Sequence, residues 1–493
     1  MPIDQFPLLS GATRLGHISE FRGGRLEMLS RAVRESEVVR VRFLHRSVLL
    51  VSGAEVAHEV IVEKAKHFEK SPGLRILLHR LAGQGLFTSE GELWRRQRKL
   101  MAPLFHPSQI GAYAELMRET ALRTAGRWKD GDTIDVGREM TRLTMAIVGK
   151  ALFDTDTFDE ADELGEALTL GLDWAGEQSA ASGLVAQLSL YEALESLRTR
   201  VPRWLSPAVD GLARINEAPI LLPGAYSSRL RKAMAMLDGK IQQMIDERRA
   251  SGLRHNDLLT RLLAARDEDD ATAHGMTDRQ VRDEAATLFV AGHETTATAL
   301  TWAIHLLAKR PDVLARVRAE ADAIGRDGPT FADAARLTTT TRVFKEALRL
   351  YPPVIALPRR ALTDVEIAGV ALPAGTIIFV SIYGIHRQPG EFPDPERFDP
   401  DHFTPEAEAR RPRGAYLPFG AGPRVCIGNH FAMLEGPLVL ATLLRDFEIS
   451  VDPALRVVPG DGATLRPSTP ISARIRTRGP RVRRLPVVPS SVG

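Results

Sequence analysis

The sequence predicts a mainly α-helical protein with a minor β portion. Helical periodicity recurs through most of the 493 residues, and the stretch from Thr277 to Arg310 is typical of a single helix of ~30 residues. β-branched and apolar runs are confined to three regions, at residues 39–51, 354–383 and 471–476. Because these strands do not alternate regularly with helices, we do not expect a parallel-sheet fold, and no internal repeat is found.

The N-terminal part of the chain is expected to be loop-like before its first strands. Residues 1 to about 35 are mixed in composition, and Gly23-Gly24 interrupts any helix there. A small β-hairpin is predicted from Val39 to Val51, and helical periodicity follows from Ala54 to Phe68.

Two further segments lead to a basic helix. Ser71-Pro72-Gly73 is predicted to interrupt the secondary structure, and the following segment to Phe87 is apolar and irregular, as expected for the wall of a pocket. Ser89 and Glu92 form a capping box for a helix that ends near Met101, before Pro103.

The middle of the chain is predicted to be helical with two loops. The pattern predicts several helices over 109–200 with breaks around Gly131 and Asp154, a proline-containing inter-helix loop over 201–227, an amphipathic helix over 229–251 and an acidic loop over 267–275.

The C-terminal part begins with the long helix. Thr277 and Gln280 form a second capping box, and Pro311 ends the helix near Arg310. The remaining pattern predicts helices over 311–323 and 339–350, strands within 354–383 around a turn at Ala374-Gly375, a helix after Gly428, a half-exposed strand over 471–476, and a frayed Arg- and Pro-rich tail from Gly479.

The composition is that of an ordinary soluble globular protein. Apolar residues make up 44% and charged residues 26%, with a formal net charge of only +3. No strong field therefore favours nucleic acid or acidic lipid as a partner. No run approaches the ~20 apolar residues that span a bilayer, and the N-terminus resembles no signal peptide. We expect a soluble cytoplasmic protein without a transmembrane segment, and a peripheral membrane contact through apolar loops remains open.

Cys426 is the only cysteine, so a disulfide within the chain and a multi-cysteine zinc site are excluded. A buried inert thiol, a nucleophile and a soft metal ligand remain, and the surroundings favour the ligand. Gly422 and Gly428 let the backbone approach a flat, bulky group. Arg424 offers a charge to an anionic group, and Phe419 can shield the sulfur. The helix that follows favours a thiolate at its N-terminus.

The spacing Phe-x-x-Gly-x-Arg-x-Cys-x-Gly from Phe419 to Gly428 resembles the haem-binding loop of the cytochrome P450 family. The resemblance implies that Cys426 is the axial thiolate of haem b, with Phe419, Gly422, Arg424 and Gly428 around the cofactor. Such a ligand pushes electron density onto the iron and favours O–O cleavage. It also implies the P450 fold, with haem between the long central helix and the C-terminal cysteine loop.

The long helix contains Ala291-Gly292-His293-Glu294-Thr295-Thr296. A glycine there leaves room for a ligand, and a threonine can bond back to the carbonyl four residues earlier and distort the helix. A purely structural reading is a Thr and a Glu that neighbouring groups satisfy. The segment resembles the family's oxygen-activation motif, which implies Glu294 as the acid, Thr295 as the alcohol and Ala291 beside the haem. His293 is interpreted as structural.

Further residues resemble the family's haem-propionate contacts. Trp94 and Arg98 lie four apart on one face of their helix, and carboxylates favour arginine. The pattern Trp-x-x-x-Arg resembles the propionate clamp, with Arg359 and Arg424 as further contacts. Arg360 lies next to Arg359, so the register of that contact is left open.

Two charged groups can be interpreted as purely structural. Glu346 and Arg349 resemble the family's buried ion pair, which Arg397 is expected to complete as a structural triad. On the helix of Trp94, residues Arg95, Arg96 and Lys99 form either a solvated face or a docking patch for an acidic electron donor.

The resemblance covers residues from about 35 to 475, in the family's order and with the family's motifs. We expect an N-terminal lead-in over 1–35, a catalytic domain over 36–478 and a frayed tail over 479–493. Too few residues follow Cys426 for a fused reductase. Electrons are therefore expected from a ferredoxin or flavodoxin with its reductase, and the protein is expected to be monomeric, as in bacterial members of the family.

The expected function is a haem-thiolate monooxygenase that hydroxylates an apolar substrate with O2 and two external electrons. The wording of the motif in the long helix and of Gly85-Leu86-Phe87-Thr88 resembles the fatty-acid-oxidising branch. Terpenoid, steroid or polyketide oxidation by the same chemistry stays open, because fold does not determine substrate. Isomerisation or dehydration on the same haem also stays open, as does a haem protein that binds a ligand without turnover.

Overall fold

The structure, a computed structural model, places most of the chain. It describes residues 2–179, 182–198, 200–202, 204–205, 207–209, 211–212, 225–251, 257–264, 276–324 and 328–478. The expected acidic loop over 267–275, the frayed tail over 479–493 and most of the proline-containing loop over 201–227 lie outside these residues.

Helices dominate the described residues, as predicted. The α-helices are α1 (Ile18–Gly23), α2 (Arg25–Glu35), α3 (Ala54–His58), α4 (Pro72–Ala82), α5 (Gly91–Met101), α6 (Pro107–Ile110), α7 (Ala114–Ala125), α8 (Val136–Phe153), α9 (Ala161–Ser179), α10 (Ser182–Arg198), α12 (Ala225–Ser251), α13 (Leu258–Ala264), α14 (Asp278–Ala308), α15 (Pro311–Asp322), α16 (Thr338–Leu350), α17 (Ile382–Ile385), α18 (Pro405–Arg410) and α19 (Asn429–Asp446). A π turn, η2 (Glu59–Glu63), and a 3₁₀ turn, η8 (Gly422–Arg424), adjoin the site described below.

The β portion consists of small sheets. The strands are β1 (Val38–Phe43), β2 (Arg46–Val51), β3 (Phe68–Lys70), β4 (Thr133–Asp135), β5 (Leu357–Ala361), β6 (Val365–Ile367), β7 (Val370–Leu372), β8 (Ile377–Val380), β9 (Phe447–Val451) and β10 (Ser472–Thr477). The largest sheet has the order β1-β2-β8-β5-β3, in which β2 and β8 run parallel and the remaining pairs are antiparallel. The predicted hairpin and the strands within 354–383 are confirmed.

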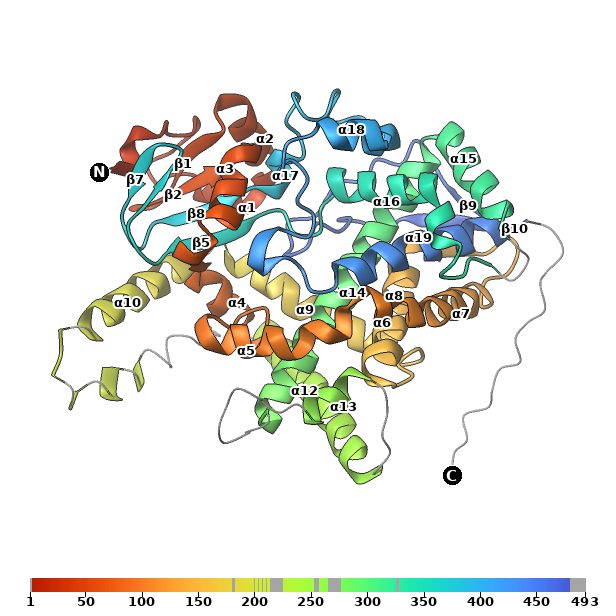
Figure 1. Ribbon diagram of the computed structural model, residues 1–493, viewed down its shortest axis with the longest axis horizontal. Coiled ribbons are helices and arrows are strands. Elements are labelled where there is room, and N and C mark those ends of the chain that lie inside the picture. Colours follow the sequence, from red (N-terminus) through yellow and green to blue (C-terminus); the bar gives the residue numbers. More distant parts are fainter. Residues whose placement is uncertain are drawn as a thin grey trace.

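The helix α14 organises the helical part of the molecule. It is 31 residues long, and Thr277 and Gln280 form the predicted capping box at its start. In Figure 1 it lies among α8, α9 and α12, with α16 and α19 at its other end, while the five-stranded sheet and the N-terminal helices lie to one side. One core cluster joins these helices, and two smaller clusters surround the sheet. Residues on α14 therefore lie close to the centre of the helical part.

Two local expectations near the N-terminus are wrong. Instead of a loop, α1 ends at Gly23 and α2 follows directly after Gly24, because Met28, Leu29 and other apolar residues of α2 are buried. Ser71 caps α4 and Pro72 occupies its first turn, so the expected breaker starts a helix instead.

The cap of α5 also differs from the prediction. Glu90, with an extended backbone, is the N-cap residue instead of Ser89, and no side chain caps this helix. Glu90 instead directs its carboxylate to other partners, which are described below, and the buried Ser89 hydroxyl has no partner among the described residues. The helix ends at Met101, as predicted.

A fully buried ion pair ties α16 to the segment before the cysteine loop. Arg349 Nε donates to Glu346 at 2.7 Å, and Arg349 also donates to the backbone carbonyls of Pro395 and Arg397, at 2.6 and 3.0 Å. Burial alone would raise the pKa of Glu346, but hydrogen bonds from Arg349 and His402 hold the pKa below its usual value.

The predicted triad is wrong in its third member. The guanidinium of Arg397 is exposed and lies 4.0 Å from Asp399, and only its backbone carbonyl meets Arg349. His402 takes the third place, with Nδ1 at 3.1 Å from Glu346. The motif Pro-Glu-Arg-Phe contains the backbone carbonyl that contacts Arg349, whereas no sequence pattern predicted the contact between His402 and Glu346.

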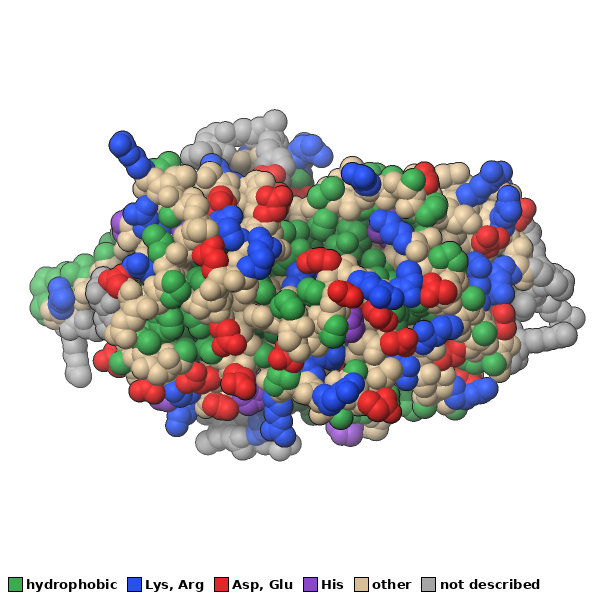
Figure 2. Space-filling model, turned by 90° about the horizontal axis from the view of Figure 1, so that it is seen from above, with side chains coloured by type: hydrophobic (Ala, Val, Ile, Leu, Met, Phe, Trp, Pro, Cys, Tyr) green, Lys and Arg blue, Asp and Glu red, His purple; other side chains and the backbone are tan. Residues whose placement is uncertain are grey.

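The surface shows no dominant charge on the face drawn in Figure 2, where basic and acidic side chains are interspersed. Of the helices in the described residues, none combines the length and apolar character that crossing a membrane requires.

Replacing Arg349 by alanine should lower the free energy of unfolding by ~3–5 kcal/mol, because Glu346 would remain as a buried charge without its partner. Urea unfolding followed by circular dichroism measures this change. The control is Arg316→Ala, which breaks an exposed pair with Asp401 and should cost no more than ~1 kcal/mol. Equal losses in the two variants would contradict the structural role of the buried pair.

Candidate functional site

The cysteine loop is closed by its own backbone. The N–H of Cys426 donates to the carbonyl of Phe419 at 2.9 Å, and the N–H of Val425 donates to Gly422 at 3.1 Å. Gly422 has φ +67° and packs directly on the carbonyl of Ile61 in η2, so a side chain there would collide with the backbone. The loop therefore needs this glycine for its conformation and for its packing on η2.

Gly428 has a different role from Gly422. Its backbone is in an ordinary conformation, and the nearest atom to an added side chain is the sulfur of Cys426, at 4.0 Å. Gly428 is the N-cap residue of α19, so the sulfur lies just before a helix N-terminus, as predicted. A glycine here leaves the sulfur accessible.

The Cys426 side chain is exposed, yet it lies deep in the protein. Burial raises the pKa of its thiol, and the N–H of Gly428 and the charge of Arg98 only partly oppose this effect. A side chain can be both solvent-accessible and surrounded by protein atoms when it faces an internal space. The helix terminus by itself does not favour the thiolate of Cys426 here, and a bound metal cation would favour it.

The exposed residues of α14 face a similar internal space. Ala291 is exposed in the middle of a helix whose other residues are mostly buried, and Thr295, one turn later, is partly exposed. The Thr295 hydroxyl donates to the Ala291 carbonyl at 2.7 Å, as the sequence predicts, but α14 continues through this point without a break. The expected room beside Gly292 is filled by Val148 of α8, at 2.8 Å from an added Cβ. Ala291 is thus the residue that leaves room for a ligand.

Glu294 lies on another face of the helix and is held by polar partners. Thr464 donates to its carboxylate at 2.9 Å and Thr169 of α9 donates at 3.4 Å. Arg466 lies 3.7 Å away. The acid and the alcohol of the motif are therefore not in contact. No sequence pattern indicated Thr169, Thr464 or Arg466.

His293 is a structural residue, as interpreted from the sequence. It is fully buried, and its Nδ1 lies 2.6 Å from the Phe289 carbonyl. Burial lowers the pKa of His293, so the ring is neutral at physiological pH.

Cationic side chains gather beside the cysteine loop. The guanidinium of Arg424 stacks on the ring of Trp94 at 3.6 Å and pairs with Glu90, while its buried Nη1 has no partner among the described residues. Arg359 is also buried, and its Nη1 donates to the neighbouring Pro358 carbonyl at 3.0 Å. Burial lowers the pKa of Arg359 to about 10, and the nearby charge of Arg424 adds to this effect.

The register of the arginine pair on β5 follows from the strand. Arg359 faces Glu90 and Arg424, whereas Arg360 points to the other side and pairs with Glu69 and Glu195. Arg359 is therefore the member of the pair that lies beside the cysteine loop.

Lys70 is a member of this cluster that sequence reasoning missed. It is buried at the end of β3, with Nζ 3.8 Å from Glu90, and it donates to the carbonyls of Leu86 and Ser89 at 2.9 Å each. Burial lowers the pKa of Lys70 to about 7, against the attraction of Glu90. A single lysine in a short strand carries no motif, which is why it gave no signal.

Arg98 lies on the same helix as Trp94 and faces the sulfur. Burial lowers the pKa of Arg98, and the charge of Cys426 opposes that shift. The predicted residues thus form two adjoining groups: Trp94, Arg359 and Arg424 surround Glu90, and Arg98 adjoins Cys426.

These residues fit a haem. Buried Lys70 and Arg359 and half-buried Arg424 lie around the carboxylate of Glu90, and this cluster of cations has capacity for further anionic groups, such as two propionates. The unpartnered Nη1 of Arg424 is one donor ready for them. The accessible sulfur of Cys426 offers the soft ligand that iron takes.

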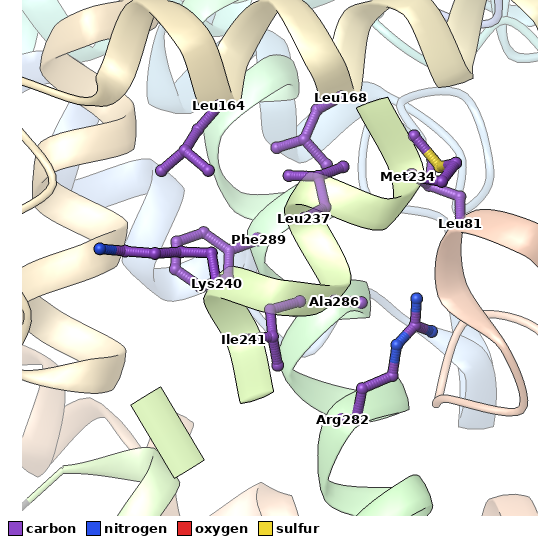
Figure 3. A pocket seen from close by; sticks show the side chains of 10 residues that line it. All are labelled: Leu81, Leu164, Leu168, Met234, Leu237, Lys240, Ile241, Arg282, Ala286 and Phe289. Atoms are coloured by element: carbon purple, nitrogen blue, oxygen red, sulfur yellow. The ribbon is translucent and has the colours of Figure 1, made fainter. Parts of the chain in front are cut away.

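An apolar pocket lies on a different face of α14. Figure 3 shows it between α4, α9, α12 and α14, with Leu168, Met234 and Leu237 among its walls and Lys240 and Arg282 at its edge. It meets α14 at Ala286 and Phe289, whereas Ala291 and Thr295 lie on another side of the helix. This pocket is therefore separate from the space beside Cys426.

Known proteins match the chain along its length. The sequence model of the cytochrome P450 family matches residues 7–473. Cyclooctatin synthase of Streptomyces melanosporofaciens is 34% identical over 94% of this chain and 92% of that protein. Pentalenene oxygenase of Streptomyces avermitilis is 31% identical over 94% and 96%.

Structure agrees with sequence. The crystal structure of the haem domain of cytochrome P450DA superposes with a TM-score of 0.80 and 25% identity, over 96% of this chain and 98% of that one. The chain therefore belongs to the cytochrome P450 family and is a haem-dependent monooxygenase.

Proposed function

We propose that this monooxygenase holds its haem through Cys426 and oxidises a polycyclic terpenoid. The observation that carries the site assignment is the accessible sulfur of Cys426 in a closed loop beside buried Arg359 and half-buried Arg424. In this proposal Trp94, Arg98, Arg359 and Arg424 hold the propionates. Phe419, Gly422 and Gly428 would shape the loop that holds the haem, and Ala291 would leave room for it.

The haem, when bound, supplies the activation of dioxygen that this chain's own side chains lack. Cys426 would contribute a thiolate to it, and the Gly428 N–H would orient the sulfur. The protein packed around the sulfur lowers the local dielectric, which strengthens the charge interactions there. Arg98 supplies a positive charge beside the same sulfur.

Thr295 and Glu294 divide the handling of protons. The Thr295 hydroxyl lies at the accessible face of α14 and holds its proton toward the Ala291 carbonyl at 2.7 Å. Rotation about its Cα–Cβ bond would turn this proton toward a substrate-side acceptor. Glu294 is held behind it by Thr464 and Thr169, so it exchanges protons through water and does not contact Thr295.

The relatives support a terpenoid substrate. Three bacterial relatives, 31 to 34% identical to this chain, carry the names cyclooctatin synthase, cyclooctat-9-en-7-ol 5-monooxygenase and pentalenene oxygenase, which are names of terpenoid monooxygenases. A fatty acid is the second candidate. It is favoured by the residues of the motif in α14 and by the segment Gly85-Leu86-Phe87-Thr88, which resemble those of the fatty-acid-oxidising branch.

The two electrons come from a redox partner, which we propose to be a ferredoxin or flavodoxin with its own reductase. On α5, Arg95 and Lys99 are exposed and Arg96 is half-buried, so this face offers charge to an acidic donor. We also propose a catalytic domain over 36–478 with a lead-in over 1–35 and a tail over 479–493. The monomeric state and the cytoplasmic location stay predictions.

Replacing Cys426 by serine should abolish the absorbance signature of thiolate-ligated haem, because a hydroxyl is a far weaker ligand for iron. Spectra of the reduced protein with carbon monoxide, recorded after haem-supplemented expression, measure this change. Wild-type protein serves as the reference. A thiolate signature that persisted in the serine variant would rule out Cys426 as the ligand.

Replacing Thr295 by alanine should lower the product formed per pair of electrons by ~10²-fold, because the accessible hydroxyl is lost from the proton path. Product and consumed reductant are quantified in the same reaction. Thr295→Ser, which keeps the hydroxyl, should retain most of the product, and haem absorbance should be unchanged in both variants. Full product from the alanine variant would contradict the role, and no product from wild type would favour a ligand-binding haem protein.

Polycyclic terpenoids should displace water from the iron and shift the haem absorbance from low to high spin. Titrations with terpenoid hydrocarbons, terpenoid alcohols, steroids and long-chain fatty acids measure this shift. Turnover should then add one oxygen atom to the terpenoid, by mass spectrometry. A shift with fatty acids alone would overturn the terpenoid proposal in favour of the second candidate.

A further inference from the structure

The loop over residues 83–90 is held against α14 by a buried carboxylate that the proposed mechanism does not use. The N–H of Leu86 donates to Glu284 Oε2 at 2.9 Å, and the N–H of Gln84 donates to Asp283 at 2.8 Å. Gly85 approaches the Asp283 carbonyl and the Thr287 side chain so closely that a Cβ would collide with them. The loop is therefore fitted to this part of α14.

The same loop is held from its other side by Lys70 and α5. Lys70 donates to the carbonyls of Leu86 and Ser89 at 2.9 Å. Gln97 of α5 donates to the Gln84 carbonyl at 2.8 Å. The loop ends at Glu90, which pairs with Arg424 and is followed at once by α5 with Trp94. Its position thus determines where α5 begins.

Glu284 is an unusual residue for this contact. It is completely buried, and its Oε1 has no hydrogen-bond partner in the described part of the chain. Burial raises the pKa of Glu284 to about 7, and the neighbouring charge of Asp283 adds to this, while the Leu86 N–H and Lys70 lower it. A glutamine could accept the same bond without a buried charge. The property that only the acid offers is a change of charge near neutral pH.

Two more polar atoms around the loop also lack partners. Gln97 Oε1 and the Ser89 hydroxyl are buried without a described hydrogen bond.

We propose that Glu284 is a positioning residue of the haem site, which fixes the 83–90 loop and the start of α5 against α14 in its neutral form and loosens them when it ionises. This inference rests on the proposed function only in assigning Trp94 and Arg98 of α5 to the haem. The groups that face Glu284 are Asp283 on its own helix, the Leu86 N–H of the loop and Lys70 of β3.

The sign of the pH dependence follows from the pKa of Glu284. In the closed loop the pKa is about 7, and in an open, hydrated loop it returns to the ordinary value of 4.5. Between these values the closed state keeps a proton that the open state has lost. The stabilisation is therefore fully present below about pH 4.5 and is lost as the pH rises through about 7. Opening should become about tenfold easier for each pH unit in that interval.

Lys70 does not contribute in the lower part of that interval. Its pKa in the closed structure is about 7, so the amine is protonated in both open and closed states below about pH 6.5. The slope between about pH 5 and 6.5 therefore reports on Glu284.

The test is hydrogen exchange by mass spectrometry on the haem-loaded full-length protein between pH 5 and 8. Observed rates for peptides that cover 83–90 and the first turn of α5 are divided by the intrinsic exchange rate at each pH. In wild type, opening should rise about tenfold per pH unit between about pH 5 and 6.5. In Glu284→Gln, which keeps the acceptor and loses the charge, the profile over the same interval should be flat, and above about pH 7 Lys70 titrates in both proteins.

Asp278→Asn is the matched control. It removes an exposed carboxylate, paired with Arg249, from the start of the same helix and should keep the wild-type slope. A flat wild-type profile, or equal slopes in wild type and Glu284→Gln, would overturn the proposal even if one variant folded poorly, since the wild-type series needs no substitution.

Haem absorbance of each sample separates this inference from the proposed function. If the protein takes up haem with a thiolate signature while the exchange profile is flat, the role of Glu284 fails and the monooxygenase assignment stands. If no haem is taken up, the link from the loop to the haem site fails. A sloping exchange profile would then show only that Glu284 controls the opening of the 83–90 loop.

Discussion

The burial of positive charge beside the cysteine loop is the constraint on which the site depends. Lys70, Arg359 and Arg424 come from β3, β5 and the cysteine loop, and the carboxylate of Glu90 lies among them, while Glu69 also acts on Arg424. Buried cations of this kind are costly unless they are paired. The arrangement is therefore favourable only around an anionic group, which explains why a sheet, a loop and a helix that are distant in the sequence meet here.

The helix α14 supplies the other wall, and its packing decides which residues can act. Val148 of α8 fills the space beside Gly292, so the glycine serves helix packing, while the methyl group of Ala291 stays accessible. The roughly 100° between successive residues of a helix then separates Thr295, at the accessible face, from Glu294, which α9 and the segment of Thr464 hold. The order of residues in one helix thus assigns different roles to neighbours.

Local signals in the sequence predicted the parts of the structure that depend on local chemistry. The capping box at Thr277, the end of α5 at Met101 and the lone Cys426 each carry their meaning within a few residues. What the sequence could not show depends on tertiary contacts: His402 in place of Arg397, Lys70 among the arginines, and the role of Ser71-Pro72 as a helix start. The single lysine and the single histidine are indistinguishable from surface residues until the fold brings them to buried acids.

The difference between local sequence motifs and tertiary contacts also explains why the reaction is better defined than the substrate. The residues that we propose to hold haem and to handle protons lie on α5, α14, β5 and the loop before α19, and the core cluster fixes α14 and α19 in place. The segments that would shape a substrate pocket, such as α4 and α9, carry apolar residues without a motif. Relatives with 31 to 34% identity can therefore carry names for different compounds. The chemistry depends on a few fixed positions, whereas substrate specificity depends on the shape of a pocket wall whose residues belong to no motif.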